Sequence, residues 1–301
     1  MSGGGGGGGA GLQAALGRAL GSEVVRTSGL SGGDINQAAQ ITLADGRELF
    51  VKSNPRSPAG MFAAEARGLA WLAEAGALRI PQVVAVAAPG DPEQFLVLEL
   101  IRRGRPARDF DEELGRGLAA LHRCGAPGFG LDHDNFIGRL PQDNRTLAPG
   151  AAPASWAAFY RERRLEAQLR MAVDGGLASG EMKRGFARLF AALETLVGPA
   201  EPPARLHGDL WGGNLMCDAA GAPCLIDPAV YGGHREIDLA MMRLFGGFGS
   251  RVFSAYDQAW PLAEGHQQRV DLYQLYPLMV HVNLFGGGYV GSVESVLSRI
   301  C

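Results

Sequence analysis

The sequence predicts an α+β protein of two lobes, a small sheet-rich lobe followed by a larger, mainly helical one. Up to Ile101, strand-like apolar runs surround a single long helical pattern. Beyond Ile101 the patterns are predominantly helical, and no internal repeat is visible. We therefore expect an N-terminal lobe over residues 11–101 and a C-terminal lobe over residues 102–301. Residues 1–10 contain seven consecutive glycines and are expected to form a disordered tail.

In the N-terminal lobe, two strand-like runs flank Asp45-Gly46, a dipeptide typical of a tight hairpin. A helix is expected from Ser57-Pro58 to Gly76, because proline suits the first turn of a helix and glycine commonly follows its end. Residues 81–86 and 94–101 are expected to add two further strands. The lobe is thus a small sheet with one major helix.

In the C-terminal lobe, Asp109 is expected to cap a helix that runs to Arg123. The sequence CDAAGAPC over residues 217–224 is typical of the turn of a short hairpin. The remaining patterns predict helices over residues 153–173, 179–197 and 267–285.

Composition excludes several classes of function. The chain has 47% hydrophobic and 20% charged residues and a net charge of −3, so no general nucleic-acid-binding surface is expected. No 18-residue apolar run and no signal-like N-terminus occur, so we expect a cytoplasmic protein without a membrane span. The four cysteines lack CxxC spacing, which favours reduced thiols; a Cys217–Cys224 disulfide is the alternative.

The polar residues of greatest interest lie in LHGDLWGGNLM, residues 206–216, and in the following LIDPAV. Asn214 follows Asp209 by five residues, and Asp227 follows Asn214 by thirteen, with the predicted hairpin between them. In phosphoryl transfer by kinase-type folds, a loop Asp orients the attacking hydroxyl, while Asn and a second Asp hold magnesium through hard oxygen ligands. Each residue alone could be a turn residue or a helix cap. Their combined order and spacing favour a magnesium–phosphate site.

A kinase also needs a lysine for the nucleotide phosphates. Lys52 lies in the apolar strand LFVKSN, and Glu65 follows thirteen residues later in the predicted helix. We expect these two to pair and grip the α- and β-phosphates. The alternatives are a solvent-facing edge-strand lysine and a glutamate on a solvated helix face.

Two further segments are candidates for nucleotide contact. In GLSGGDIN, Gly32 and Gly33 would permit close backbone approach to phosphate, although a simple hairpin turn fits the same residues. The backbone of Leu98, Glu99 and Leu100 is expected to bind the adenine edge; a plain buried strand is the alternative.

These residues resemble the fructosamine-3-kinase, or ketosamine-3-kinase, family within the aminoglycoside-phosphotransferase-like branch of protein-kinase-like folds. The general phosphotransferase skeleton is HGD…N…D. The resemblance to the ketosamine kinases covers residues 11–300, and its specific features are Trp211 and the motifs DPAVYGGHREIDLAM, GFGLDHDNFIGRLPQDN and FYRERRLEAQL.

The resemblance implies a bilobal protein-kinase-like fold and ATP- and Mg²⁺-dependent phosphorylation of the 3-hydroxyl of a ketosamine. The 3-phosphate product is unstable, which implies protein deglycation. Asp209 would be the catalytic base, and Asn214 with Asp227 would bind magnesium. Asp238 would brace the catalytic loop, with a plain N-cap as its alternative, and His207 is expected to be structural.

The resemblance also bears on the oligomeric state and on where the acceptor binds. Some relatives carry a cysteine where this chain has Asp34, so we expect no redox-linked dimer through that loop, and a monomer or weak homodimer. A metal site at Asp132-His133-Asp134 is not expected, because consecutive residues converge poorly on one ion. The candidate substrate residues are Trp211, Asp134, Asn135, Trp156, Arg164 and Gln168.

Two other functions fit parts of the pattern. A related phosphotransferase for aminoglycosides, choline or homoserine would be expected to show an acidic cluster or an aromatic cage, and neither is evident. A catalytically inactive nucleotide-binding protein would be expected to lack one of Lys52, Asp209, Asn214 and Asp227, and all four are present.

Overall fold

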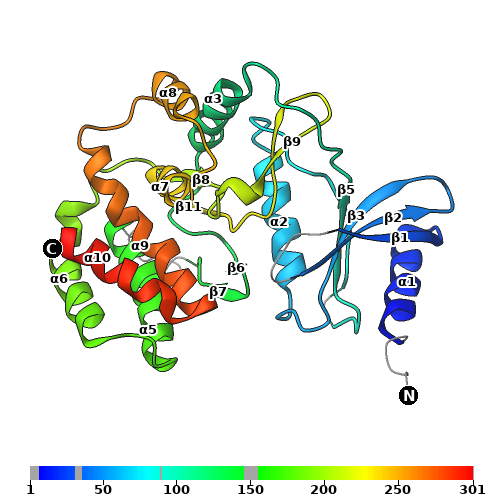
Figure 1. The fold of residues 1–301 in the computed structure, drawn as a ribbon, viewed down its shortest axis with the longest axis horizontal. Helices are drawn as coiled ribbons and strands as arrows, with labels where there is room; N and C mark the ends of the chain where they lie inside the picture. Colours follow the sequence, from blue (N-terminus) through cyan, green and yellow to red (C-terminus); the bar gives the residue numbers. More distant parts are fainter. Residues whose placement is uncertain (1–6, 31–35, 89, 146–154, 301) are drawn as a thin grey trace.

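The computed structural model describes residues 7–30, 36–88, 90–145 and 155–300, which form two lobes (Figure 1). The predicted tail to residue 6, Gly32, Gly33 and Asp34 lie outside the described residues. In the described N-terminal lobe, five antiparallel strands pair in the order β1-β2-β3-β5-β4. The strands are β1 (Val24–Leu30), β2 (Gln37–Leu43), β3 (Glu48–Ser53), β4 (Val83–Val86) and β5 (Phe95–Glu99).

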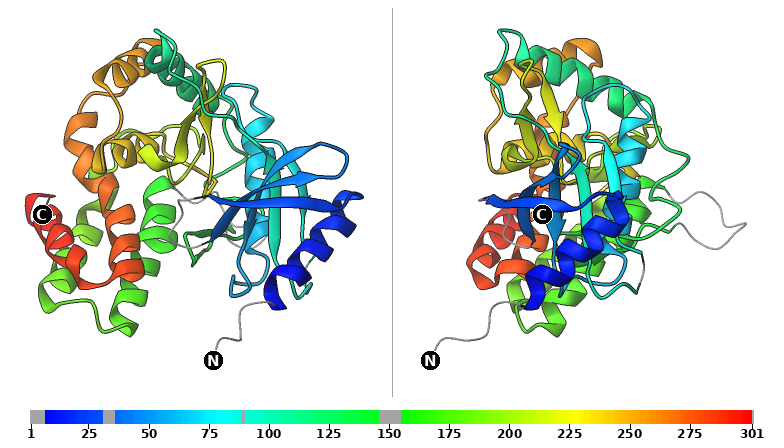
Figure 2. Two further views of the ribbon diagram at one scale, coloured as in Figure 1. Left: turned by 45° about the vertical axis from the view of Figure 1, so that its right-hand side comes forward. Right: turned by 90° about the vertical axis from the view of Figure 1, so that its right-hand side faces the viewer.

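Two helices pack on opposite faces of this sheet, α1 (Gly7–Leu20) on the outside and α2 (Met61–Ala73) toward the other lobe (Figure 2). Leu16 and Leu20 of α1 are buried against Ile41 and Val51 of the sheet. Helix α2 buries Phe62 and Leu69 against Leu96 and Leu98. Each face of the sheet therefore has its own apolar cover, as an isolated small sheet requires.

Two predictions in this lobe are wrong in detail. Helix α1 begins at Gly7, so it includes residues 7–10 that were expected in the disordered tail. The buried leucines of α1 hold the helix to the sheet and outweigh the low helix propensity of glycine. Helix α2 starts at Met61 rather than near Pro58, because Gly60 precedes it in the left-handed conformation with φ 79°. The expected Asp45-Gly46 hairpin and the strands of β4 and β5 are confirmed.

The C-terminal lobe is mainly helical, as predicted, with short two-stranded sheets near the lobe boundary (Figure 1). Its helices are α3 (Phe110–Arg123), α4 (Trp156–Phe159), α5 (Glu166–Asp174), α6 (Gly180–Leu196), α7 (Glu236–Leu244), α8 (Ser250–Ala259), α9 (His266–Phe285) and α10 (Val290–Ile300). Its strands are β6 (Asn135–Ile137), β7 (Leu140–Gln142), β8 (Ala204–Leu206), β9 (Leu215–Cys217), β10 (Pro223–Leu225) and β11 (Tyr231–Gly233).

The helix expected over residues 153–173 is interrupted by a π-helical turn at Tyr160–Leu165. Such a turn breaks the α-helical repeat and is common at functional positions. Here it carries Arg164, whose side chain is fully buried. The other expected helices are confirmed, and Ser179 caps α6 by accepting a hydrogen bond from Met182 N. Asp109 precedes α3 without a side-chain capping bond.

The β9–β10 hairpin has the predicted turn, and its register also settles the cysteine question. Cys217 pairs with Pro223, and Cys224 pairs with Met216, so the two sulfurs are not cross-strand partners. Both are free thiols, and burial raises the pKa of Cys224 to about 12. Among the described residues, no helix is both long and apolar enough to cross a membrane.

Candidate active site

The segment from His207 to Asp227 brings the predicted polar residues together. Strand β8 leads into the His207–Asn214 loop, and the β9–β10 hairpin connects Asn214 to Asp227. The side-chain nitrogen of Asn214 donates to the backbone oxygen of Asp209 at 2.8 Å and to its carboxylate at 3.1 Å. The same nitrogen lies 3.3 Å from the backbone oxygen of Asp227. The hairpin thus brings Asn214 and Asp227, thirteen residues apart in sequence, into contact in one site.

The backbone of this site is unusual in two places. Gly208 has φ +82°, and a Cβ there would lie 2.0 Å from Ala229 O, so only glycine fits. Asp227 has φ 56° and is the one non-glycine residue with positive φ in the described part of the chain. Such a conformation costs of order 1–3 kcal/mol and persists where the surroundings over-determine it, often at functional sites.

Asp238, buried in α7, braces the loop through its backbone. Its two carboxylate oxygens accept hydrogen bonds from His207 N at 2.8 Å and Gly208 N at 2.9 Å. His122 of α3 contacts the same carboxylate at 3.1 Å and Tyr256 Oη at 2.8 Å. Although burial acts to raise the pKa of Asp238, the hydrogen bond from His122 and the nearby charges hold it below the usual value. The sequence pattern gave no signal for His122.

His207 has the geometry of a structural residue. Its Nε2 lies 2.9 Å from Ile226 O, and Asp209 N donates to its Nδ1 at 3.3 Å. Burial lowers the pKa of His207 despite the carboxylate of Asp238 nearby. A neutral ring with its proton on Nε2 satisfies both contacts.

Lys52 of β3 is buried, and its ammonium group contacts Glu65 of α2 at 2.7 Å and Asp227 at 2.5 Å. Burial opposes the charged form, but the two carboxylates raise the pKa of Lys52 above its usual value. Burial raises the pKa of Glu65, against the effect of Lys52. These contacts exclude the solvent-facing alternatives for both residues. They also join the N-terminal lobe to the loop that carries Asp227.

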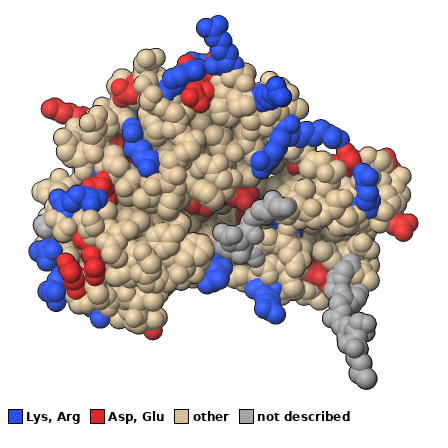
Figure 3. Space-filling model, in the orientation of Figure 1, with Lys and Arg blue, Asp and Glu red and all other residues tan. Residues whose placement is uncertain are grey.

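Asp209 is partly buried beside two other carboxylates. Burial raises its pKa to about 7, the charges of Asp227 and Asp238 act in the same direction, and the hydrogen bond from Asn214 opposes them. A carboxylate with a pKa near neutrality is suited to exchange a proton with a hydroxyl group at physiological pH. Figure 3 shows acidic side chains at the centre of the molecule, between the two lobes.

The expected adenine-binding segment lies at the end of β5. Leu98 is paired with Phe50 and Val83 in the sheet, and Glu99 N donates to Gln82 O at 2.9 Å. The carboxylate of Glu99 binds Arg79 and accepts from Gln82 N. The backbone amide of Glu99 is therefore engaged within the lobe, whereas Leu100 lies just beyond the paired strand.

Four of the six candidate substrate residues lie in the interior and form no open hydroxyl-binding face. Most of their polar groups have internal partners, and Arg164 Nε is the exception. Trp156 Nε1 donates to Tyr273 Oη at 3.1 Å, and Gln168 accepts a hydrogen bond from Asn283. Asp134 is half-buried and pairs with Arg145. The buried side chains, which correct our expectation, are Asn135, Trp156, Arg164 and Gln168.

Trp211 differs, because it is 41% exposed and lies beside Asp209. A Cβ at Gly213 would lie 2.3 Å from its ring, so glycine there lets the indole fold over the loop. Gly212 lies close to Gly246 and Gly247, at the end of α7.

An aromatic cluster that the sequence analysis missed lies next to this end of α7. The ring of His281 is 4.6 Å from that of Phe245, 5.4 Å from Phe285 and 5.1 Å from Tyr289. Phe245 and Phe285 are 40% and 53% exposed. Part of the signal was present in the sequence, because His281 and Phe285 are four residues apart on one helix, α9.

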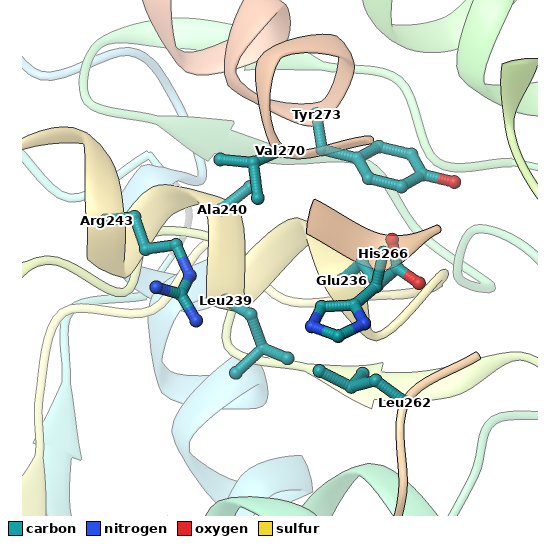
Figure 4. A pocket seen from close by; sticks show the side chains of 8 residues that line it. All are labelled: Glu236, Leu239, Ala240, Arg243, Leu262, His266, Val270 and Tyr273. Carbon is teal, nitrogen blue, oxygen red and sulfur yellow. The ribbon is translucent and has the colours of Figure 1, made fainter. Parts of the chain in front are cut away.

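A small cavity lies beside α7 (Figure 4). Its volume of about 10 Å³ would hold about one water molecule, so it is no substrate site. It is lined by Glu236, Leu239, Ala240, Arg243, Leu262, His266, Val270 and Tyr273.

Comparison with known proteins now identifies the family. The family model described as fructosamine kinase matches residues 12–301. The chain belongs to the fructosamine kinase family. A probable ketoamine kinase of Synechocystis is 39% identical over 273 residues, which cover 90% of this chain and 88% of that protein. The predicted family and its phosphotransferase activity are confirmed.

Solved structures confirm the predicted fold of this fructosamine kinase family member. A putative fructosamine-3-kinase from Thermobifida fusca superposes with a TM-score of 0.84 at 38% identity, covering 96% of this chain and 98% of that one. Aminoglycoside phosphotransferase APH(4)-Ia superposes with a TM-score of 0.60 at 16% identity, covering 97% and 99%. The second likeness concerns the fold alone.

Proposed function

We propose that the chain is an ATP-dependent kinase that phosphorylates the 3-hydroxyl group of ketosamines, the adducts of sugars with amines or protein lysines. The observation that carries the proposal is the convergence of Lys52, Asp209, Asn214 and Asp227 in one site, with an exposed Trp211 beside it. Because the 3-phosphate of a ketosamine is unstable, the reaction would release the sugar and repair the amine.

On the nucleotide side, Lys52 held by Glu65 would bind the α- and β-phosphates as a point charge. Leu100, beyond the paired part of β5, would offer its backbone to the adenine edge, since Glu99 N already donates to Gln82 O. Asp227 would exchange its contact with Lys52 for the metal–phosphate complex when nucleotide enters.

The residues present fit a magnesium ion. Asp227 supplies a carboxylate that is 40% exposed. Asn214 uses its amide nitrogen to donate to Asp209, so its amide oxygen is not used in that contact and would be the atom that binds the metal. Oxygen ligands of this kind suit Mg²⁺. In the part of the chain described, no group of three His, Cys, Asp or Glu side chains is arranged for a metal, so the phosphates would complete the coordination. The ion would neutralise charge on the transferring phosphoryl group.

On the acceptor side, Asp209 would orient the sugar hydroxyl and accept its proton as the phosphoryl group transfers. Trp211 offers an exposed ring for the sugar or its protonated amine, since a cation over an aromatic face is attracted by it. The cluster of Phe245, His281 and Phe285 would extend this apolar wall toward the group that carries the amine.

The test is ATP consumption across a panel of fructosamines, ribulosamines, erythrulosamines and unrelated alcohols. We expect activity on ketosamines only, and Asp209→Asn to lower turnover by roughly 10²–10⁴-fold while ATP binding persists. Equal rates on all alcohols, or none on ketosamines, would refute the substrate class. Near-normal turnover by the variant would refute the role of Asp209.

A further inference from the structure

We propose that five buried polar side chains position the segment after Asp227 and thereby fix the phosphoryl-transfer site. This Arg164 network consists of Asn135, Gln142, Asn144, Arg164 and Tyr276, none more than 4% exposed. It rests on the proposed kinase function, although its geometry can be tested without substrate. The members come from β6, β7, the loop after β7, the π-helical turn and α9.

One branch of the network is a directed chain of hydrogen bonds. Arg164 Nη2 donates to Asn144 Oδ1 at 2.6 Å, and Asn144 Nδ2 donates to Asn135 Oδ1 at 2.7 Å. Asn135 Nδ2 then donates to Val230 O at 2.8 Å. All three links run in the same direction from a charged donor, so they polarise one another toward the Val230 carbonyl.

A second branch reaches the neighbouring carbonyl. Tyr276 Oη donates to Gln142 Oε1 at 2.5 Å, and Gln142 Nε2 donates to Ala229 O at 3.1 Å and to Asn135 at 2.7 Å. Ala229 N in turn donates to His207 O at 2.9 Å. The network therefore grips two successive carbonyls, beginning two residues after Asp227, and connects them to the catalytic loop.

Arg164 is buried without a carboxylate partner among the described residues, unlike Arg235 and Arg269, which pair with glutamates. Its Nη1 donates to two backbone oxygens, and its guanidinium lies 3.8 Å from the ring centroid of Tyr231. A buried cation carries a desolvation cost that a pair of apolar side chains would avoid. A contribution to stability alone therefore does not explain why an arginine is buried at position 164.

The strained backbone of Asp227 explains why the segment after it needs to be held in place by the network. A positive φ persists only where the surrounding contacts over-determine it. Asn214 holds the Asp227 carbonyl from one side, and the Arg164 network holds the two residues that follow Pro228 from the other. Loosening either side would let the Asp227 carboxylate drift from its position opposite Lys52.

The test compares two buried tyrosines of α9 that differ in their partners. Tyr276→Phe removes a donor from the network, whereas Tyr273→Phe removes a hydroxyl outside it that donates to Val197 O at 2.7 Å and accepts from Trp156 Nε1 at 3.1 Å. We expect Tyr276→Phe to lower kcat on the order of tenfold with KM for ATP and ketosamine within about twofold, because small misplacements act on the transition state. Tyr273→Phe should retain kcat with a similar melting temperature. Arg164→Met should lower kcat more than Tyr276→Phe does.

Hydrogen exchange of the ligand-free protein supplies the second readout. We expect the Ala229 amide to exchange faster in Tyr276→Phe than in Tyr273→Phe, since its acceptor loop is loosened. Equal exchange at Ala229, or equal kcat in the two variants, would overturn the proposal. If Arg164→Met does not fold, the tyrosine pair still decides. A protein with the exchange difference but no activity on ketosamines would refute the substrate class and leave the positioning intact.

Discussion

Asp209 is removed from water beside the carboxylates of Asp227 and Asp238, and its burial, with a smaller effect of these charges, raises its pKa and so affects stability. A folded-state pKa of about 7, above the usual 3.8, means that the folded protein prefers protonated Asp209. Protonation of Asp209 therefore contributes to the free energy of unfolding of the ligand-free protein. This contribution is complete below the unfolded-state pKa of about 4 and is lost as the pH rises to about 7.

Asp209→Asn should accordingly stabilise the ligand-free protein at high pH, because it removes the ionisable group. We expect a melting temperature about 2–5 °C above wild type at pH 8, with the difference vanishing near pH 4. Differential scanning calorimetry of both proteins across this range checks it. A difference that is constant with pH would mean that the Asp209 carboxyl is not perturbed.

The structure brings predicted site residues together where the chemistry of a side chain and its spacing pointed to the same place. Lys52, Glu65, Asp209, Asn214 and Asp227 converge because a strand, a helix and a hairpin fix their intervals. Asn135 and Arg164 were assigned to substrate because they lie in the middle stretch that resembles the ketosamine kinases. Their burial depends on contacts with residues far along the chain, which spacing does not reveal. His122 was missed for the same reason.

At the scale of elements, the β9–β10 hairpin links Asn214 and Asp227, the proposed metal-binding residues, to the segment expected to bind adenine. Arg79 contacts Asp218 of the hairpin at 2.5 Å and also the Glu99 carboxylate at the end of β5. The hairpin further accepts a backbone bond from Gly104 N at Cys217 O. Arg79 therefore connects the two ends of the proposed nucleotide site.

Arg79→Gln should weaken this coupling. We expect KM for ATP to rise roughly three- to tenfold, since partly exposed charge pairs contribute about 1 kcal/mol. Asp218→Asn should have a similar effect, and the double variant should be no worse than either single one. Arg47→Gln, which breaks an exposed pair with Asp45, is the matched control. Additive losses in the double variant would show that the two residues act independently.

At the scale of the whole molecule, the predicted boundary near Ile101 divides the helices and strands between two lobes, but one hydrophobic core extends across it. Leu72 of α2 is buried with Leu114, Leu210 and Val230 of the other lobe. Arg205 also stacks on Trp71 and donates to its backbone oxygen. Sequence patterns locate strands and helices, but they do not show which apolar face packs across a boundary.

Because the core that contains Leu72 crosses between the lobes, the two should unfold together. We expect one transition in urea, with tryptophan fluorescence and far-ultraviolet circular dichroism coinciding. Leu72→Ala should destabilise by about 2–5 kcal/mol and shift both probes equally, as deletion of a buried leucine does. Leu30→Ala, at an exposed leucine of β1, should change stability little. Two separated transitions, or a Leu72→Ala shift confined to one probe, would establish independent lobes instead.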